Sequence, residues 1–363
     1  MKISRIVIAL SGAFSGTFAF ECQAQSAVTF YGTIDAGIRS LTNVNAAGNR
    51  LVKLSSNGEF YNNRIGFKGD EDLGGGVRAH FLLESGWNTG TGELDNWQNK
   101  LFNRYSLVGL EGPFGVVDFG RMPSLSCKII SFYDPFQYHY VHTIPLAGAT
   151  AGHPDGNLPG NPFGTMGGTR FNNDVQYIGK VGSLLFGAEY AFGETNGVVK
   201  DGKAQAIAIG YNTETFMIGG GYTRQKPNVA AFGPAIYRDQ DQITFGGAYR
   251  IGNIRFSGGY IRTSTDDGIA PIRHQMKNIW AGASYDVTST IAVTLGYYRT
   301  TLESDGYELA RRNFAILGTT YALSKRTTLY AALDHAELSG IATLPTEGQT
   351  SQIGISTGIS HSF

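Results

Sequence analysis

The sequence predicts an all-β chain that closes into a transmembrane antiparallel barrel of about 16 strands. Apolar and polar residues alternate along many segments, as in 352–363, where Ile353 and Ile355 alternate with Gly354 and Ser356. The segments are separated by short and long polar connections in turn. After the N-terminal segment no apolar run approaches the ~20 residues of a membrane-spanning helix. Strands must therefore cross the membrane, and the lack of water for unpaired edges forces closure.

Residues 1–24 predict a secretory signal peptide that is removed. Lys2 and Arg5 precede an apolar stretch at 6–20, and a small-x-Ala cleavage signal ends at Ala24. The alternative is an N-terminal helix of the mature domain, but no stripe of polar residues runs through the apolar stretch. We therefore expect the mature chain to begin after this segment.

Residues 25–363 show no linker or change of composition, so one barrel domain is expected. The strand after the first long connection is expected to be irregular before Tyr61. The predicted strands are 27–40, 51–69, 77–87, 101–111, 114–121, 169–179, 183–193, 204–212, 215–224, 241–251, 254–263, 275–286, 291–299, 311–321, 326–336 and 350–363.

The connections predict two different rims. Short turns mark a periplasmic rim, and longer polar loops mark an extracellular rim. The short turns are 70–76, 112–113, 181–182, 213–214, 252–253, 287–290 and 323–325. The longer loops are 42–50, 88–100, 194–203, 225–240, 264–274, 301–310 and 337–349.

The connection at 122–168 is much longer than the others, and long insertions in compact domains are commonly functional. A barrel of this size leaves an aqueous channel. We expect this third long loop to fold inward and form the constriction.

Composition excludes several functions. The chain has 50 Gly, 22 Phe and 19 Tyr with only 16% charged residues, which suits turns and membrane-interface girdles. Basic and acidic residues balance at 29 each, so nothing favours a nucleic-acid partner. Only Cys127 remains after the signal segment, which rules out an internal disulfide. No cofactor motif is present, and neither is a base-activated cysteine.

Four stretches together resemble a known family, the Gram-negative general diffusion porins of the beta-proteobacterial type. They are VTFYGTIDAG at 28–37; GDEDLGGG at 69–76 continuing to FLLESG at 81–86; FNR at 102–104 with VGL at 108–110 and FGR at 119–121; and HSF at 361–363. The resemblance implies a sixteen-stranded barrel in outer-membrane lipids. It also implies a homotrimer, a third loop folded into the lumen, and Phe363 as the signal for the barrel assembly machinery. Cys127 and the Gly/Pro-rich stretch 147–168 depart from the family pattern.

Strand parity predicts which side chains line the channel. Outward Val28, Phe30, Ile34 and Ile38 leave Arg39 inward, and on 101–111 we expect Tyr105 and Leu107 outward with Ser106 inward. The expected lining and constriction residues are Tyr31, Asp35, Arg39, Arg64, Lys68, Arg78, Glu84, Arg104, Arg121 and, from the loop, Asp134.

The lining therefore predicts a basic wall. The loop that faces it carries only Asp134 and Asp155 as acids. Fixed cations in a narrow aqueous passage concentrate anions, so we expect a modest preference for small anionic or polar solutes. Arg39 and Arg78 are the best candidates by position. The alternative for Arg64, Arg104 or Arg121 is a structural pair with Asp35, Glu84 or Asp118.

Three other functions remain open. The loop aromatics could stack on sugar rings in a sugar-selective pore, although packing against the wall is favoured; they are Phe132, Tyr133, Phe136, Tyr138 and Tyr140. A barrel enzyme is disfavoured because no nucleophile motif accompanies the histidines. His139 and His142 lack further ligands at metal spacing, so no metal site is expected. An additional adhesin role for the loops is left open.

Overall fold

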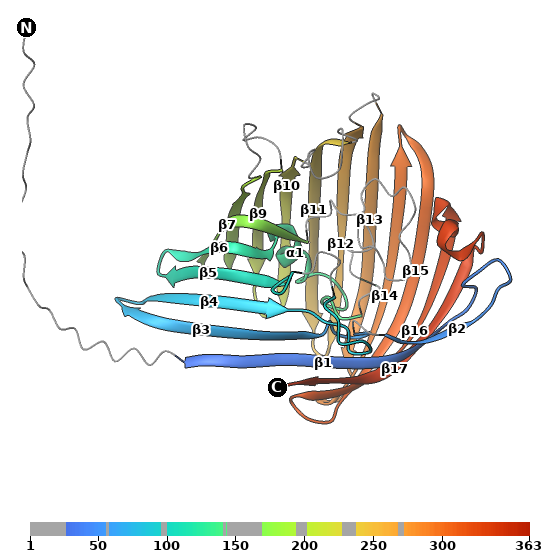
Figure 1. Cartoon of the computed structure of the whole chain (residues 1–363), viewed down its shortest axis with the longest axis horizontal. Helices are drawn as coiled ribbons and strands as arrows, with labels where there is room; N and C mark the ends of the chain where they lie inside the picture. Colours follow the sequence, from blue (N-terminus) through green and yellow to red (C-terminus); the bar gives the residue numbers. More distant parts are fainter. Residues whose placement is uncertain are drawn as a thin grey trace, which may run out of the picture.

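The strands of the protein form one closed antiparallel ring in a computed structural model, which describes residues 27–55, 58–95, 100–140, 143, 169–193, 202–226, 237–267 and 272–363 (Figure 1). The strands are β1 Ala27–Leu41, β2 Leu51–Ser55, β3 Arg64–Gly74, β4 Val77–Ser85, β5 Tyr105–Gly112, β6 Gly115–Pro123, β7 Arg170–Val181, β8 Leu184–Ala191, β9 Ala204–Asn212, β10 Phe216–Gln225, β11 Tyr237–Ile251, β12 Ile254–Asp267, β13 Arg273–Asp286, β14 Ile291–Ser304, β15 Tyr307–Ala322, β16 Thr327–Gly340 and β17 Ser351–Ser362. Among the described residues, two short helices accompany the strands, α1 Leu125–Ile130 and η1 Ile341–Thr346.

The ring closes between its first and last strands. β1 pairs with β17, and the amide of Phe363 donates to the carbonyl oxygen of Gly32 at 3.1 Å. On its other edge β1 pairs with β2 through residues 37–41 and with β3 through residues 27–33. β2 and β3 are thus two halves of one span, so the 17 strand segments make a sixteen-stranded barrel. The fold class predicted from the sequence is confirmed, as is the irregularity before Tyr61.

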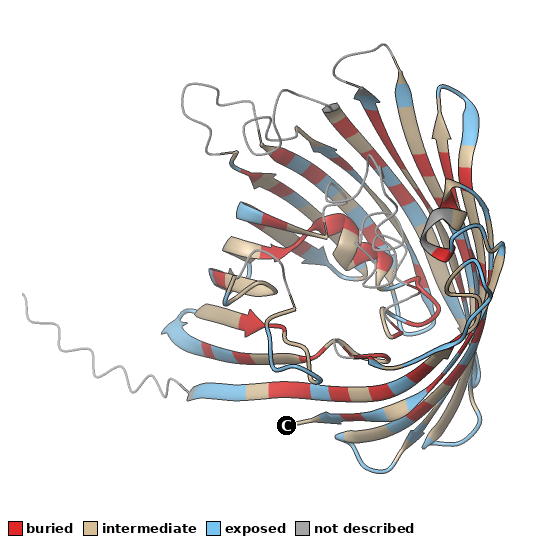
Figure 2. Cartoon of the chain, turned by 45° about the vertical axis from the view of Figure 1, so that its right-hand side comes forward, coloured by how far each residue is buried: buried red, intermediate tan, exposed pale blue. Residues whose placement is uncertain are grey.

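Buried residues alternate with more exposed ones along the strands, visible as alternating colours (Figure 2). On β1 the side chains of Val28, Phe30 and Ile38 are 64%, 50% and 57% exposed, whereas Thr33 and Asp35 are 5% and 0% exposed. The exposed apolar side chains face outward. This is the arrangement that a bilayer around the barrel requires.

The phase of the alternation on β5 differs from the prediction. Val108 and Leu110 are exposed and face outward, whereas Leu107 is buried and Tyr105 aligns with inward Glu84. Ser106 consequently lies on the outer face. Both phases of this segment contain apolar side chains, so alternation alone could not select the correct one.

One of the expected long loops is a tight turn instead. At 301–310, β14 and β15 continue until only Asp305 and Gly306 separate them, with φ values of 50° and 85°. Two successive residues with positive φ fit the hairpin turn for which Asp-Gly is favoured. The expected loop at 337–349 also begins later, because β16 runs to Gly340. Among the described residues, no helix is long and apolar enough to span a membrane.

Candidate functional site: the interior of the barrel

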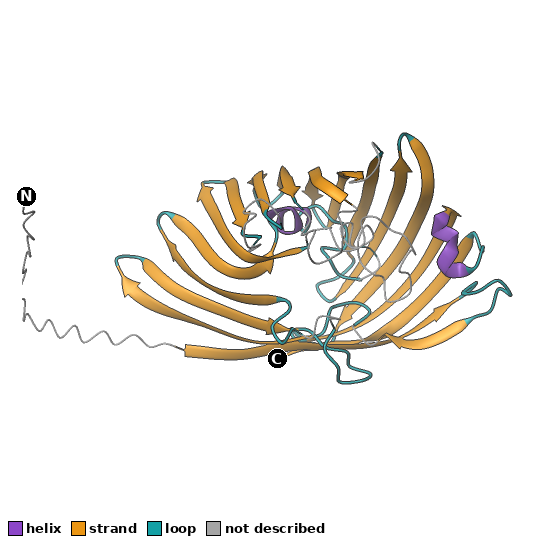
Figure 3. Ribbon diagram, turned by 45° about the horizontal axis from the view of Figure 1, so that its top comes forward, coloured by secondary structure: helices purple, strands orange, loops and turns teal. Residues whose placement is uncertain are grey.

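Residues 124–140, here called the inserted loop, lie inside the curve of the strands (Figure 3). α1 starts this segment: the Ser124 hydroxyl accepts a hydrogen bond from the Cys127 amide at 3.2 Å. The carboxylate of Glu189 on β8 accepts the Leu125 amide at 3.1 Å. The loop is therefore attached to the inner wall from its first turn. Residues 141, 142 and 144–168, including His142, His153 and Asp155, lie outside the described residues.

Glycines on the inner wall make room for side chains of the loop, most of them aromatic. A Cβ added to Gly246 would lie 2.3 Å from the Tyr133 ring, and one added to Gly318 would lie 2.8 Å from the Tyr140 ring. We call this set the glycine track: Gly246, Gly259, Gly282, Gly296 and Gly318.

The burial of the aromatic rings of the loop decides between the two roles considered for them, which are stacking on sugars and packing against the barrel wall. Tyr133, Phe136 and Tyr140 are 0%, 5% and 1% exposed. They pack against the wall and present no open ladder of rings for a sugar. Phe132, at 39% exposed, is the most exposed of the five aromatic residues.

Asp134 holds the middle of the inserted loop. Its Oδ1 accepts the Tyr298 hydroxyl at 2.7 Å and its Oδ2 accepts the Tyr138 amide at 2.8 Å. The side chain is fully buried, and burial raises its pKa to about 6. The expectation that Asp134 faces the lumen as an acidic pole is corrected, because its carboxylate is enclosed by the groups that it binds.

Residues 58–63, between β2 and β3, turn inward around another buried carboxylate. Asp35 accepts the amides of Glu59 at 2.7 Å, Phe60 at 3.4 Å and Tyr61 at 3.3 Å. The Tyr330 hydroxyl donates to the same carboxylate at 2.8 Å. Asp35 faces inward as parity predicts, but its role is to satisfy backbone donors that would otherwise be unpaired.

Arg39 is covered by the same segment. Its guanidinium lies 2.8 Å from Asp334 and 3.1 Å from Glu59, and the residue is 4% exposed. The prediction that Arg39 is an open lumen charge is wrong. The inward turn of residues 58–63 places Glu59 over it, and parity along a regular strand could not anticipate that turn.

The inserted loop and the segment 58–63 meet in a contact that we call the clasp. It consists of Phe60, Tyr61, His139 and Tyr140. The His139 ring stacks on both Phe60 and Tyr61, with centroid distances of 4.6 and 4.7 Å. The Tyr140 amide donates to the Phe60 carbonyl oxygen at 2.7 Å. Burial lowers the pKa of His139 to about 4, so the ring is neutral at pH 7.

Five of the predicted lining residues do come together beside the clasp. The Arg64 guanidinium lies 3.9 Å from the Tyr61 ring centroid, and Lys68 Nζ lies 5.4 Å from that of Tyr31. Glu84 accepts a hydrogen bond from the Tyr31 hydroxyl at 2.8 Å and forms an ion pair with Arg104 at 2.7 Å. Within the described part of the chain, neither Arg64 nor Lys68 pairs with a carboxylate. The structural pairing considered for arginines therefore applies to Arg104.

Two predicted residues lie apart from this group. Arg78 is beside the short turn before β4 and pairs with Glu111 at 2.8 Å, with both side chains about half exposed. This position at the rim corrects its expected place in the constriction. Arg121 aligns with outward Ser106 and donates to the Asn103 carbonyl at 2.7 Å and to Asn172 at 2.6 Å.

Arg255 and Arg312 are inward arginines that were not among the predicted residues. Arg255 on β12 donates to the backbone carbonyl of Asp134 at 3.4 Å and also to that of Phe132. Arg312 on β15 lies 4.2 Å above the Phe314 ring. Parity on β12 and β15 places both inside, so the same reasoning extended to these strands would have found them.

Cys127 sits on α1 with a partly buried side chain. Burial raises the pKa of its thiol, which disfavours the nucleophilic thiolate. Across the described ranges, no three His, Cys, Asp or Glu side chains gather as metal ligands do. The interior therefore holds charged side chains beside the attached loop.

A closed barrel with an apolar outer face and a charged lumen defines a channel-forming protein of the outer membrane. A family model described as Gram-negative porin matches residues 7–340, and the chain belongs to that family. Porins are passive diffusion channels for small hydrophilic solutes.

The similarity to individual porins extends along the whole chain. The chain is 28% identical over 383 residues to outer membrane porin protein 32 of Delftia acidovorans, with 100% of both chains covered. It is 26% identical over 413 residues to an outer membrane porin protein of Bordetella pertussis, covering 98% of this chain and 99% of that one. A solved structure, the anion-selective porin from Comamonas acidovorans, is similar with a TM-score of 0.74 and 26% identity, covering 93% of this chain and 100% of that one.

Proposed function

We propose that this porin prefers small hydrophilic anions and that Arg64 and Lys68 provide the preference. The observation that carries the proposal is the asymmetry of charge around the clasp. Arg64 and Lys68 have no carboxylate partner among the described residues, whereas neighbouring Glu84 pairs with Arg104 and Asp35 is buried. An unpaired cation in a narrow passage raises the local concentration of anions. The anion selectivity of the similar Comamonas porin supports the same assignment.

The test is the reversal potential of the refolded protein in a planar bilayer under a KCl gradient. We expect a chloride preference, and we expect Arg64→Gln with Lys68→Gln to shift the reversal potential toward that of potassium. Lys325→Gln is the control, because Lys325 is an exposed residue of the turn before β16. A cation preference in the unchanged protein, or equal shifts in both variants, would contradict the proposal.

We further infer that the channel narrows at residues 122–168 and that the protein assembles as a homotrimer in outer-membrane lipids after loss of residues 1–24. Phe363 is proposed as the residue read by the barrel assembly machinery. Its backbone pairing with Gly32 at the closing edge supports a role in assembly. Three equal conductance steps per insertion event would support the trimer, and single steps would oppose it. N-terminal sequencing of the exported protein tests the cleavage.

A further inference from the structure

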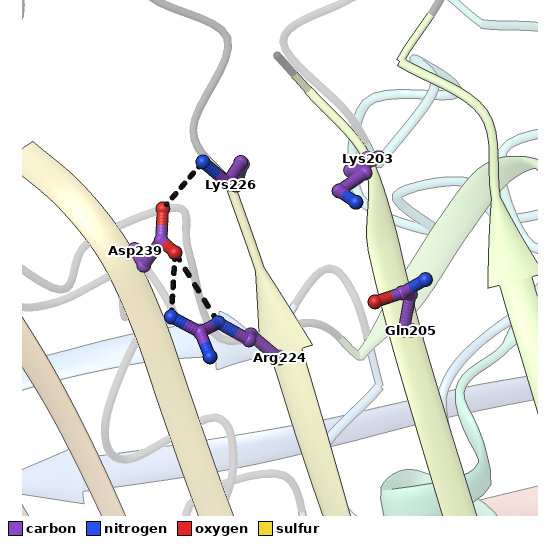
Figure 4. A pocket seen from close by; sticks show the side chains of 5 residues that line it. All are labelled: Lys203, Gln205, Arg224, Lys226 and Asp239. Carbon is purple, nitrogen blue, oxygen red and sulfur yellow. Dashed lines mark hydrogen bonds and ion pairs between the residues drawn. The ribbon is translucent and has the colours of Figure 1, made fainter. Parts of the chain in front are cut away.

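A pocket of about 300 Å³ lies beside β9, β10 and β11. It is at the ends of these strands that are remote from the short turns. We call it the rim pocket. It is lined by Lys203, Gln205, Arg224, Lys226 and Asp239. Lys203 and Gln205 stand on one side of it, opposite Arg224 and Lys226 (Figure 4).

The rim pocket opens on the outer surface of the barrel. Gln205 aligns with Arg224, and the neighbouring residues on the opposite face, Ala204, Ala206 and Thr223, are buried inside. Arg224 therefore projects away from the lumen, and its side chain is 51% exposed. The ions that pass through the channel do not meet this group.

The charges in the rim pocket are unequal. Three cations share a single lining carboxylate, Asp239, which lies 2.7 Å from Arg224 Nη2 and 3.2 Å from Lys226 Nζ. Asp241 lies farther from the arginine, at 3.8 Å, and accepts the Tyr222 hydroxyl. Lys203 forms no ion pair within the described ranges.

The backbone fixes the two lysines opposite each other. The amide of Lys226 donates to the carbonyl oxygen of Lys203 at 2.8 Å. The salt bridges to Asp239 in turn orient Arg224 and Lys226. The pocket therefore presents a prearranged set of donors in which three cations face two carboxylates.

The outer face directly below the rim pocket is apolar. The next outward row holds Ile207 and Tyr222, which pair across β9 and β10 and are 62% and 37% exposed. Ile209 and Phe245 follow in the row after that, at 59% and 58% exposed. A cationic pocket above an apolar strip matches an amphiphile with an anionic head.

We propose that the rim pocket binds the phosphorylated headgroup of a lipid of the outer leaflet. The phosphate accepts hydrogen bonds from Lys203, Arg224 and Lys226, and the acyl chains lie along the Ile207 and Ile209 rows. Charge-assisted bonds from Arg and Lys to phosphate are among the strongest that side chains form, and basic pockets on membrane proteins hold anionic headgroups. The inference requires the outer-membrane location but not the proposed anion preference, because Arg64 and Lys68 lie inside the barrel.

The test uses native mass spectrometry of the full refolded chain in detergent. The probes are diphosphorylated lipid A, the same lipid without its phosphates, and inorganic phosphate. We expect the diphosphorylated lipid to stay bound and Lys203→Gln with Lys226→Gln to weaken its binding by about tenfold or more. Lys203→Arg with Lys226→Arg should retain it. The matched control is Lys325→Gln with Arg326→Gln, which removes two charges at the opposite rim.

Unchanged single-channel conductance in all variants shows that the barrel is folded. Equal lipid binding by the Gln variant and the control would overturn the proposal. So would equal binding of the lipid without phosphates. Displacement of the lipid by inorganic phosphate at similar concentration would overturn the choice of a lipid, because it would identify a site for the free ion.

Discussion

The backbone amide of Tyr140 donates a hydrogen bond to the carbonyl oxygen of Phe60 at 2.7 Å. This bond joins two segments that both leave the barrel wall, the inserted loop and residues 58–63. Asp35 fixes one side of the clasp, and the glycine track fixes the other. The position of the loop in the channel therefore depends on groups at widely separated places in the sequence.

Removing the ring of Phe60 is expected to loosen the clasp. Phe60 stacks on His139 and on Tyr330 and meets Tyr140 edge to face, and each such pair contributes about 1 kcal/mol. Phe60→Ala should raise the single-channel conductance and the current noise in a planar bilayer. The control is Phe216→Ala on the outer surface, at 38% exposed. An unchanged conductance in Phe60→Ala would show that the clasp does not hold the loop.

Asp35→Asn should destabilise the folded protein. The amide side chain keeps one acceptor oxygen but loses the charge that binds the amides of 59–61 and the Tyr330 hydroxyl. We expect a loss of about 1–3 kcal/mol, seen as a lower temperature of barrel unfolding by circular dichroism. Asp70→Asn, at an exposed residue of β3, serves as the control. Equal unfolding temperatures would mean that the charge of Asp35 is not needed.

The attachment of the inserted loop should respond to pH through two groups of opposite sign. The pKa of Asp134 rises from 3.8 to about 6 in the attached loop. Its contribution to the free energy of loop attachment is therefore fully present below pH 3.8 and is lost as pH rises through 6. The pKa of His139 falls from 6.5 to about 4. Its contribution to the free energy of loop attachment is therefore present above pH 6.5 and is lost as pH falls through 4. Each is worth on the order of 3 kcal/mol, and the two oppose each other between pH 4 and 6.

Variants separate the two groups. Asp134→Asn should make the loop more sensitive to acid than in the unchanged protein, because only His139 then titrates. His139→Gln should give a loop that is held more firmly at pH 4.5 than at pH 7. Hydrogen exchange of residues 124–140 at these two pH values measures both effects. The same pH dependence in both variants would contradict the assignment.

A methyl group on the glycine track should displace the loop. In Gly246→Ala the new Cβ would lie 2.3 Å from the Tyr133 ring, so the ring and the attached chain must move. We expect faster labelling of Cys127 by a maleimide reagent, since α1 precedes Tyr133 directly. The control is Gly221→Ala, whose Cβ faces inward but meets only strand atoms at 3.1 Å or more. Equal labelling rates would show that Tyr133 does not position α1.

Alternation of side chains predicted the barrel and the inward direction of Asp35, Arg39, Arg64 and Lys68, because these properties depend on local geometry alone. The sequence did not reveal which inward charges stay open. Arg39 is neutralised by Glu59 and Asp334, and the latter is 295 residues away in the chain. Asp134 is bound by Tyr298 of β14, which lies 164 residues away in the chain. The glycines of the inner wall could have indicated where the loop packs, but only once the register between neighbouring strands was known.

The inserted loop makes bonds to strands that follow it at long range in the chain. Tyr133 reaches Thr244 on β11, and Tyr140 reaches the carbonyl oxygen of Ala331 on β16, 191 residues later. During synthesis the loop therefore emerges long before the surfaces that hold it. A chain truncated before β16 would lack the Ala331 carbonyl oxygen that binds Tyr140 and the β17 edge that pairs with β1. The last hydrogen bond of the loop and the closure of the ring therefore depend on the same final strands, so neither can be completed without β16 and β17.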